Sequence, residues 1–227
     1  MDPMIRRGIV RDALAVAVAT AAYGLSFGAL AVAADFSVAQ AAVLSALAFT
    51  GASQLVFVAI LGDGGTALAA VSVALLLGAR NGLYAVRLTP LMQWRGWRRV
   101  LGAHLTIDET TAMATARDDP AQTRLAFWAT GILLWTLWNL STVIGALAGN
   151  AVGSPETWGL DVAFPAAFVA LLAPQLRTRR AIVTAVTAVL VALVLVPFAA
   201  LGVALLAPAL VVVPIAWWWR PEWEHRK

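Results

Sequence analysis

The chain has 227 residues, of which 61% are hydrophobic and 12% are charged, and its mean hydropathy is +0.83. Soluble proteins carry about 25% charged residues, and a soluble domain of this length has too much surface to hide so large an apolar fraction. The composition excludes a soluble enzyme, a nucleic-acid-binding module and a disordered chain, and it indicates a protein that folds in the lipid bilayer. The net charge of +4 comes from basic residues in short clusters between apolar segments, as in membrane loops. Because the chain has no cysteine, disulfide bonds and thiolate metal sites are excluded as well.

Apolar segments follow one another along the whole chain and predict a single transmembrane domain over residues 1–227. The first segment follows a cluster of arginines, as a signal peptide would, but its 22 residues between Asp12 and Asp35 favour an uncleaved span. The full series lies at about 13–34, 39–62, 66–86, 100–116, 125–148, 160–176, 181–196 and 198–219.

Two of these segments differ from the rest because polar residues interrupt them. Segment 39–62 contains Gly51-Ala52-Ser53-Gln54 in its middle, and the short segment 100–116 contains Asp108 and Glu109. Non-helical backbone is tolerated at membrane depth only where it is buried in protein or lines a cavity. We therefore expect both segments to be broken helices or re-entrant hairpins.

The arginines favour the re-entrant interpretation. If segment 39–62 crossed the membrane, the cluster from Arg87 to Arg99 would lie opposite the N-terminal arginines, against the positive-inside rule. If both interrupted segments return to their own side, every basic residue except Arg80 is cytoplasmic. The prediction is an all-α integral membrane protein with about six transmembrane helices, two re-entrant or broken helical segments and both termini in the cytoplasm. Tryptophans beside the basic clusters are interpreted as anchors at the inner interface: Trp94, Trp97, Trp217, Trp218, Trp219 and Trp223.

Arg80 lies within the third apolar segment, where an isolated charge is costly. An arginine at the centre of a membrane helix costs about 2.5–3.5 kcal/mol on insertion scales. We therefore expect a carboxylate partner among Asp108, Glu109 and Asp161. The alternative is a side chain that extends to the inner interface, since Arg87 lies only two turns away.

Asp108 and Glu109 form a carboxylate pair, and a helix would place His104 and Asp108 on one face. A pair that lines a cavity can bind an ammonium group or a cation, and it can titrate near neutral pH. The alternatives are an interfacial helix whose acids face the cytoplasm, and a metal site of His104 with the two acids. The sequence contains no second ligand set with the spacing of a metal site, so we predict neither metal nor cofactor.

Glycine and small polar residues predict breaks in the first two membrane segments. Gly24-Leu25-Ser26-Phe27-Gly28 is expected to interrupt the first segment, and the second is expected to restart at Ser53, which would cap the new helix. The positive end of such a half-helix can hold a substrate carboxylate at mid-membrane. The alternative is tight helix packing by small residues, as we also expect for Gly145 and Gly149.

Together these motifs resemble the AzlC family, also called the YgaZ family, which comprises the large subunits of two-component branched-chain amino acid exporters. They follow one another in the family's order over about 140 residues, although Gly78 and Asn81 replace the family's usual Asn and His. The matching stretches are Tyr23–Gly28, Phe49–Gln54, Ala79–Tyr84, Thr106–Thr110 and Gly159–Asp161.

The resemblance implies a secondary transporter subunit and no enzyme. It would export valine, leucine, isoleucine or similar amino acids across the bacterial cytoplasmic membrane together with a small AzlD- or YgaH-like membrane subunit. Apart from the resemblance, we expect proton antiport as the simplest energy source, with one acid of the pair as the proton carrier. Asp108 or Glu109 would bind the ammonium group, and Arg80 or the backbone near Gly51 would bind the carboxylate. The alternative is a membrane-embedded enzyme that acts on a lipid headgroup through His104 and the two acids. The predicted substrate and translocation residues are Gly24, Ser26, Phe27, Gly28, Gly51, Ala52, Ser53, Gln54, Arg80, Asn81, Tyr84, Asp108, Glu109, Thr110 and Asp161.

Overall fold

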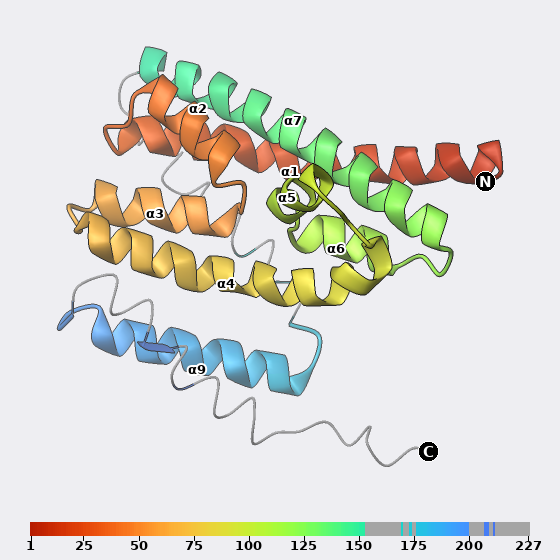
Figure 1. Ribbon diagram of the computed structural model, residues 1–227. Coiled ribbons are helices and arrows are strands. Elements are labelled where there is room, and N and C mark those ends of the chain that lie inside the picture. The colour runs from red at the N-terminus through yellow and green to blue at the C-terminus, as the bar shows by residue number, and fades with distance from the viewer. Residues whose placement is uncertain (153–168, 170–172, 174–175, 200–206, 209–210, 212–227) are drawn as a thin grey trace.

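The computed structural model in Figure 1 describes residues 1–152, 169, 173, 176–199, 207, 208 and 211. The described parts form helices and contain no strand, so the prediction of an all-α protein is confirmed there. The helices are α1 (Pro3–Ala33), α2 (Val38–Leu47), α3 (Ala52–Gly62), α4 (Ala67–Met92), α5 (Trp97–His104), α6 (Asp108–Thr115), α7 (Pro120–Val152) and α9 (Arg179–Leu195). The predictions for Asp161, for the tryptophans from 217 onward and for most of segments 160–176 and 198–219 lie outside the described residues.

Three of the helices in the described parts, α1, α4 and α7, are long and apolar enough to cross a membrane. Short polar side chains set where the helices begin. Thr66 Oγ1 accepts a hydrogen bond from Ala69 N at 3.2 Å at the start of α4, and Thr178 caps α9 in the same way. Asp119 Oδ1 accepts bonds from the first free amides of α7, just before Pro120. These caps satisfy amides that a helix leaves unpaired at its N-terminus.

The segment 39–62 is a hairpin of two short helices, as the arginine pattern predicts. A capping box between Ser37 and Gln40 starts α2, which runs toward the middle of the molecule, and α3 runs back (Figure 1). The end of α3 packs closely against the end of α1, because a Cβ on Gly62 would lie 2.9 Å from the Cβ of Ala34. The hairpin therefore begins and ends at the same end of the molecule.

The segment 100–116 is also broken. α5 follows the end of α4 after a four-residue turn, and α6 ends four residues before α7 begins. Non-helical residues 105–107 separate the two short helices. Because α4 ends and α7 begins at the same end of the molecule, the segment enters and leaves there (Figure 1). His104 and Asp108 therefore lie on different helices, and the expectation that one helix face carries both is wrong.

The helix order repeats in inverted orientation, although no internal repeat is evident in the sequence. A long helix is followed by two short ones in α1–α2–α3 and again in α4–α5–α6, and the two long helices run in opposite directions (Figure 1). Each long helix ends at a left-handed residue, Asp35 with φ of 63° and Gln93 with φ of 49°. Many membrane transporters are built from two such inverted halves, with the binding site between them.

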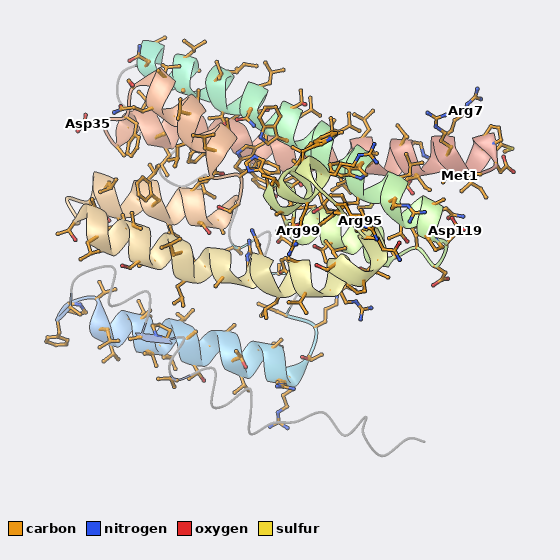
Figure 2. The ribbon with its side chains drawn as sticks, viewed as in Figure 1. Met1, Arg7, Asp35, Arg95, Arg99 and Asp119 are labelled. Atoms are coloured by element: carbon orange, nitrogen blue, oxygen red, sulfur yellow. The ribbon has the colours of Figure 1, made fainter. Side chains whose placement is uncertain are left out.

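The N-terminal arginines and the first turn after α1 lie at opposite ends of the molecule. Figure 2 places Met1, Arg7 and Asp119 at one end and Asp35 at the other. Among the described residues, Arg117 in the turn between α6 and α7 forms a long-range ion pair with Asp12 in the third turn of α1, at 3.0 Å. The predicted cytoplasmic location of both termini is based on the positions of the arginines.

Glycines bring α1 and α7 into backbone contact. A Cβ on Gly28 would overlap the carbonyl oxygen of Thr142, and a Cβ on Gly145 would overlap that of Leu25. The predicted close helix contact of Gly145 and Gly149 is thereby confirmed, since Gly149 also faces α1 at Ala29. In a bilayer, helices associate through such close packing because lipid removes the hydrophobic drive between them.

The expected break in the first segment is absent, because α1 is continuous from Pro3 to Ala33. Gly24 and Gly28 serve close packing against α7. Phe27 between them is fully buried and stacks on Trp138 with ring centroids 6.2 Å apart. The sequence alone does not distinguish these uses, since small residues serve both backbone breaks and helix contacts.

We predict that Gly28→Ala destabilises the protein, because the new methyl group must displace the backbone of α7. The expected loss is about 1–3 kcal/mol, as for other overpacked sites, and it would be measured as the thermal unfolding temperature in detergent. Gly8→Ala is the matched control on the same helix, because nothing lies within 4 Å of the added Cβ. Its expected effect is neutral or slightly stabilising. Equal unfolding temperatures for the two variants would contradict the packing role.

Candidate functional site

Arg80 and Asp108 form an ion pair in the middle of the protein. Arg80 Nη1 lies 3.6 Å from Asp108 Oδ2. Arg80 is about 20 Å along α4 from its first residue, given the helical rise of about 1.5 Å per residue. The expected carboxylate partner is therefore present and comes from the start of α6. The two side chains remain 39% and 46% exposed, so a small ligand can reach both charges.

The start of α3 lies beside the same part of α4. Gly51, with φ of 63°, is the N-cap, and no side chain caps the helix. The prediction that Ser53 caps the helix is wrong, because α3 begins one residue before it. Ser53 is instead buried and points toward α4, where its Oγ would lie 3.6 Å from a Cβ on Gly78. An uncapped helix start offers free amides and a positive dipole end to an anion.

Gln54 holds the break between α2 and α3 together. Its amide nitrogen donates to Leu44 O at 3.0 Å and to Ser45 O at 3.2 Å, which are carbonyls in the last turn of α2. Leu44 O also accepts a hydrogen bond from Ala48 N at 2.9 Å, and the Gln54 side chain adds hydrogen bonds that connect the end of α2 to the start of α3. This structural role was not part of the interpretation from the sequence, which assigned Gln54 to the substrate.

A threonine organises the second break. Thr110 Oγ1 accepts a hydrogen bond from Ile107 N at 3.0 Å and lies within hydrogen-bonding distance of Leu105 O, at 2.8 Å. The side chain is fully buried, and it fixes the turn that aims the start of α6 at α4. Asp108 and Glu109 are the first two residues of α6, where the helix dipole favours negative charge.

Several buried polar atoms around this centre have no hydrogen-bond partner among the described residues. They are Ser53 Oγ, Gln54 Oε1 and Asn81 Oδ1, and Thr130 Oγ1 on α7 is unsatisfied as well. Buried polar groups in native proteins are nearly always satisfied, so a cluster of unsatisfied ones indicates a place for a polar ligand or water. Thr130 was not predicted from the sequence, although a threonine in a long apolar segment is a usable signal.

Glu109 lies in α6, outside the three helices that are long enough to span a membrane. Burial, and after it the neighbouring charge of Asp108, raise the pKa of Glu109, and the net effect of all contributions is a shift from 4.5 to about 7. The hydrogen bond to its own backbone amide and the charge of Arg80 act in the opposite direction. A carboxyl group with this pKa can take up and release a proton under physiological conditions.

The predicted site residues fall into two groups. One group lies on the middle of α4 and on the two short helices that contact it: Arg80 and Asn81 on α4, Gly51, Ala52, Ser53 and Gln54 at the start of α3, and Asp108, Glu109 and Thr110 at the start of α6. Tyr84 lies one turn further along α4 and is half-buried. Gly24, Phe27 and Gly28 lie in the interface of α1 and α7, and the half-buried Ser26 lies on α1 between them.

The metal site considered from the sequence has no support in the described part of the chain. No group of three histidine, aspartate or glutamate side chains there is placed to hold an ion. His104 instead contacts Phe49 across the two breaks, with ring centroids 6.1 Å apart. This contact connects the first hairpin to the second.

These features define a multi-pass helical membrane protein with two broken segments that contact each other, one of which supplies the carboxylate of a central charge pair. This is the arrangement of a transporter. The chain belongs to the AzlC protein family, whose match covers residues 15–152. It is 29% identical over 189 residues to the inner membrane protein YgaZ of Escherichia coli K12, covering 80% of this chain and 76% of that protein. It is also 27% identical over 154 residues to an uncharacterized membrane protein of Helicobacter pylori 26695, covering 67% of each. No solved structure matches the chain.

We predict that Arg80→Ala lowers the free energy of unfolding by about 1–2 kcal/mol, between the values typical of exposed and buried ion pairs. The reason is that Asp108 loses its partner. The measurement is thermal or denaturant unfolding in detergent. Arg87→Ala is the control, because Arg87 is exposed on the same helix and forms no ion pair with a described residue. Removing both Arg80 and Asp108 should cost less than the sum of the single losses, and strict additivity would refute the pairing.

Glu109 predicts a defined pH dependence of stability. Between pH 4.5 and about 7 the folded protein retains a proton that the unfolded chain has released. Raising the pH therefore favours unfolding: the contribution is complete below pH 4.5 and is lost once the pH exceeds about 7. The melting temperature of the wild type should fall across this range more steeply than that of Glu109→Gln. Asp63→Asn removes a carboxylate from an exposed turn and should keep the wild-type slope. Parallel profiles for the wild type and Glu109→Gln would exclude the assignment.

Proposed function

We propose that the protein exports branched-chain amino acids across the bacterial cytoplasmic membrane and that Arg80 and Asp108 bind the zwitterionic part of the substrate. The observation that supports this proposal is the accessible ion pair at the middle of α4, 3.6 Å across. An amino acid carries one carboxylate and one ammonium group, so it can insert between the two side chains. Its carboxylate then pairs with Arg80 and its ammonium group with Asp108, and one ion pair becomes two.

The empty site and the loaded site have the same net charge under this scheme. Without substrate, Arg80 and Asp108 neutralise each other, which lowers the cost of holding charge at membrane depth. A bound zwitterion adds one positive and one negative charge, so the net charge of the site stays the same. The free amides at the start of α3 and the buried Ser53 hydroxyl supply further hydrogen bonds for the carboxylate.

Glu109 is the proposed coupling group. Glu109 follows Asp108 in the chain but is not part of the ion pair, because Asp108 is the residue that contacts Arg80. Its proton affinity falls in the range that a proton antiporter requires. Protonation of Glu109 would remove a negative charge next to the substrate's ammonium group and weaken its binding, which provides a physical link between proton uptake and substrate release.

The small partner subunit is part of the same proposal. In the described part of the chain, α4 exposes a broad row of apolar side chains and is the least buried of the three candidate spans. The row includes Leu68, Leu75, Leu76, Leu83 and Val86. A second membrane subunit that covers α4 would also complete the wall around Arg80.

The test is transport of labelled leucine by proteoliposomes that contain the purified chain, with and without the small subunit. We predict that Asp108→Asn and Arg80→Ala each weaken leucine binding by about 10–100-fold, the value of a lost charge-assisted hydrogen bond. Asp63→Asn and Arg87→Ala are the matched controls and should transport as the wild type does. Normal leucine affinity in both site variants would overturn the proposal.

Competition separates a zwitterion site from a simple hydrophobic pocket. Isoamylamine lacks the carboxylate of leucine, and isocaproate lacks its ammonium group. Because each analogue satisfies only half of the ion pair, neither should compete with leucine at similar concentrations. Competition by either analogue as strong as that by unlabelled leucine would contradict the arrangement.

A further inference from the structure

A second feature lies at the end of the molecule that holds the N-terminal arginines, and it has no part in the proposed transport site. A hollow of about 460 Å³ is lined by aromatic and basic side chains from the end of α4, the start of α5 and the start of α7. The residues that matter are Trp94, Arg95, Trp97, Arg98, Arg124 and Trp128. Two segments far apart in the sequence, residues 92–98 and 124–128, therefore bring three guanidinium groups and three indole rings to one place.

The arginines of this hollow are available to a ligand. None of the three ion pairs found among the described residues involves Arg95, Arg98 or Arg124, and all three side chains are exposed. Arg98 lies over the ring of Trp97, with its guanidinium carbon 5.8 Å from the ring centroid. Like charges that gather without counter-ions are unfavourable unless an anion joins them.

The aromatic floor of the hollow is rigid. Trp94 packs on Phe127 with ring centroids 4.9 Å apart and on Trp128 at 6.2 Å. A Cβ on Gly102 of α5 would lie 2.8 Å from the Trp94 ring, so only glycine admits this contact. The buried indole N–H of Trp94 has no acceptor in the described part of the chain. The floor of the site is therefore built from packed aromatic side chains, one of which carries an unused donor.

The surroundings indicate what kind of anion fits. Trp97 is 69% exposed, and Val100 and Leu101 next to it on α5 are exposed as well. Figure 2 places Arg95 on the side of the molecule that carries Arg7, away from Asp35. Tryptophan beside arginine at the end of a membrane helix is typical of the lipid headgroup region. A soluble anion could pair with the arginines, but it would not cover the apolar surface beside them.

We propose that this hollow binds the phosphate headgroup of an anionic phospholipid, whose acyl chains lie against the exposed face of α5. Arg95, Arg98 and Arg124 surround the phosphate, and the indole rings line the glycerol region. Basic pockets between membrane helices bind anionic headgroups in this way. The proposal does not depend on the transported substrate.

The test is native mass spectrometry of the purified full chain in detergent, titrated with phosphatidylglycerol or phosphatidylcholine of identical acyl chains. The wild type should bind the first phosphatidylglycerol about tenfold or more tightly than the first phosphatidylcholine, since each arginine near a headgroup contributes about 1 kcal/mol. The variant with Arg95→Gln, Arg98→Gln and Arg124→Gln should lose this preference. A wild type without the preference would refute the site, whether or not the variant folds.

A matched variant and a soluble competitor complete the design. Arg6→Gln, Arg7→Gln and Arg87→Gln remove the same charge from exposed positions that do not line this hollow, and the lipid preference should persist. An equal loss in both triple variants would mean diffuse attraction and would overturn the proposal. Glycerol phosphate at millimolar concentration should leave the lipid bound. Displacement by it would assign the hollow to a soluble phosphate compound instead.

Discussion

A charged side chain in the middle of a membrane helix must find an opposite charge or water, and this requirement shapes the centre of the protein. Arg80 is the charged side chain in question, and Asp108 supplies the opposite charge at a distance of 3.6 Å. To bring Asp108 there, the chain breaks its second hairpin at residues 105–107 and starts a new helix with the carboxylate in its first turn. Thr110 then replaces the hydrogen bonds that the break removes. The geometry of a whole hairpin thus follows from one arginine.

Each break is stabilised by a side chain that lies just inside the helix that follows it. Gln54 occupies the third position of α3, and Thr110 occupies the third position of α6. Both are buried, and both bond to backbone groups on the far side of their own break. The two halves of the inverted repeat therefore solve the same problem by the same means with different residues. In α3 no side chain caps the first turn, whereas in α6 the first turn carries two carboxylates of its own. One half is suited to an anion and the other to a cation.

Much of this arrangement could be predicted from the sequence, because the cost of charge in lipid is large and position-dependent. The arginine distribution predicted both hairpins, and the isolated Arg80 predicted its partner. The role of small residues could not be predicted in the same way. The sequence does not distinguish Gly24 from Gly51. Gly24 lies in a continuous helix and packs against α7, whereas Gly51 is the N-cap of α3 and has a positive φ. Glycine allows either outcome, and the choice depends on which helix lies opposite, which is a property of the assembled fold. The same holds for Gln54, whose partners are carbonyls in the last turn of α2, about ten residues earlier in the chain.

The contact between α1 and α7 has a consequence for how the protein is made. Gly28 meets Thr142, which lies 114 residues later in the chain. At about 5–20 residues per second, a ribosome needs roughly 6–23 seconds to synthesise that interval. During this time α1 resides in the bilayer with its glycine face against lipid, and both hairpins emerge before the helix that completes the core. Insertion of the first span and its docking are therefore separate events in time. A defect in the glycine interface acts on the second event and leaves a chain that is inserted, unassembled and open to membrane quality control.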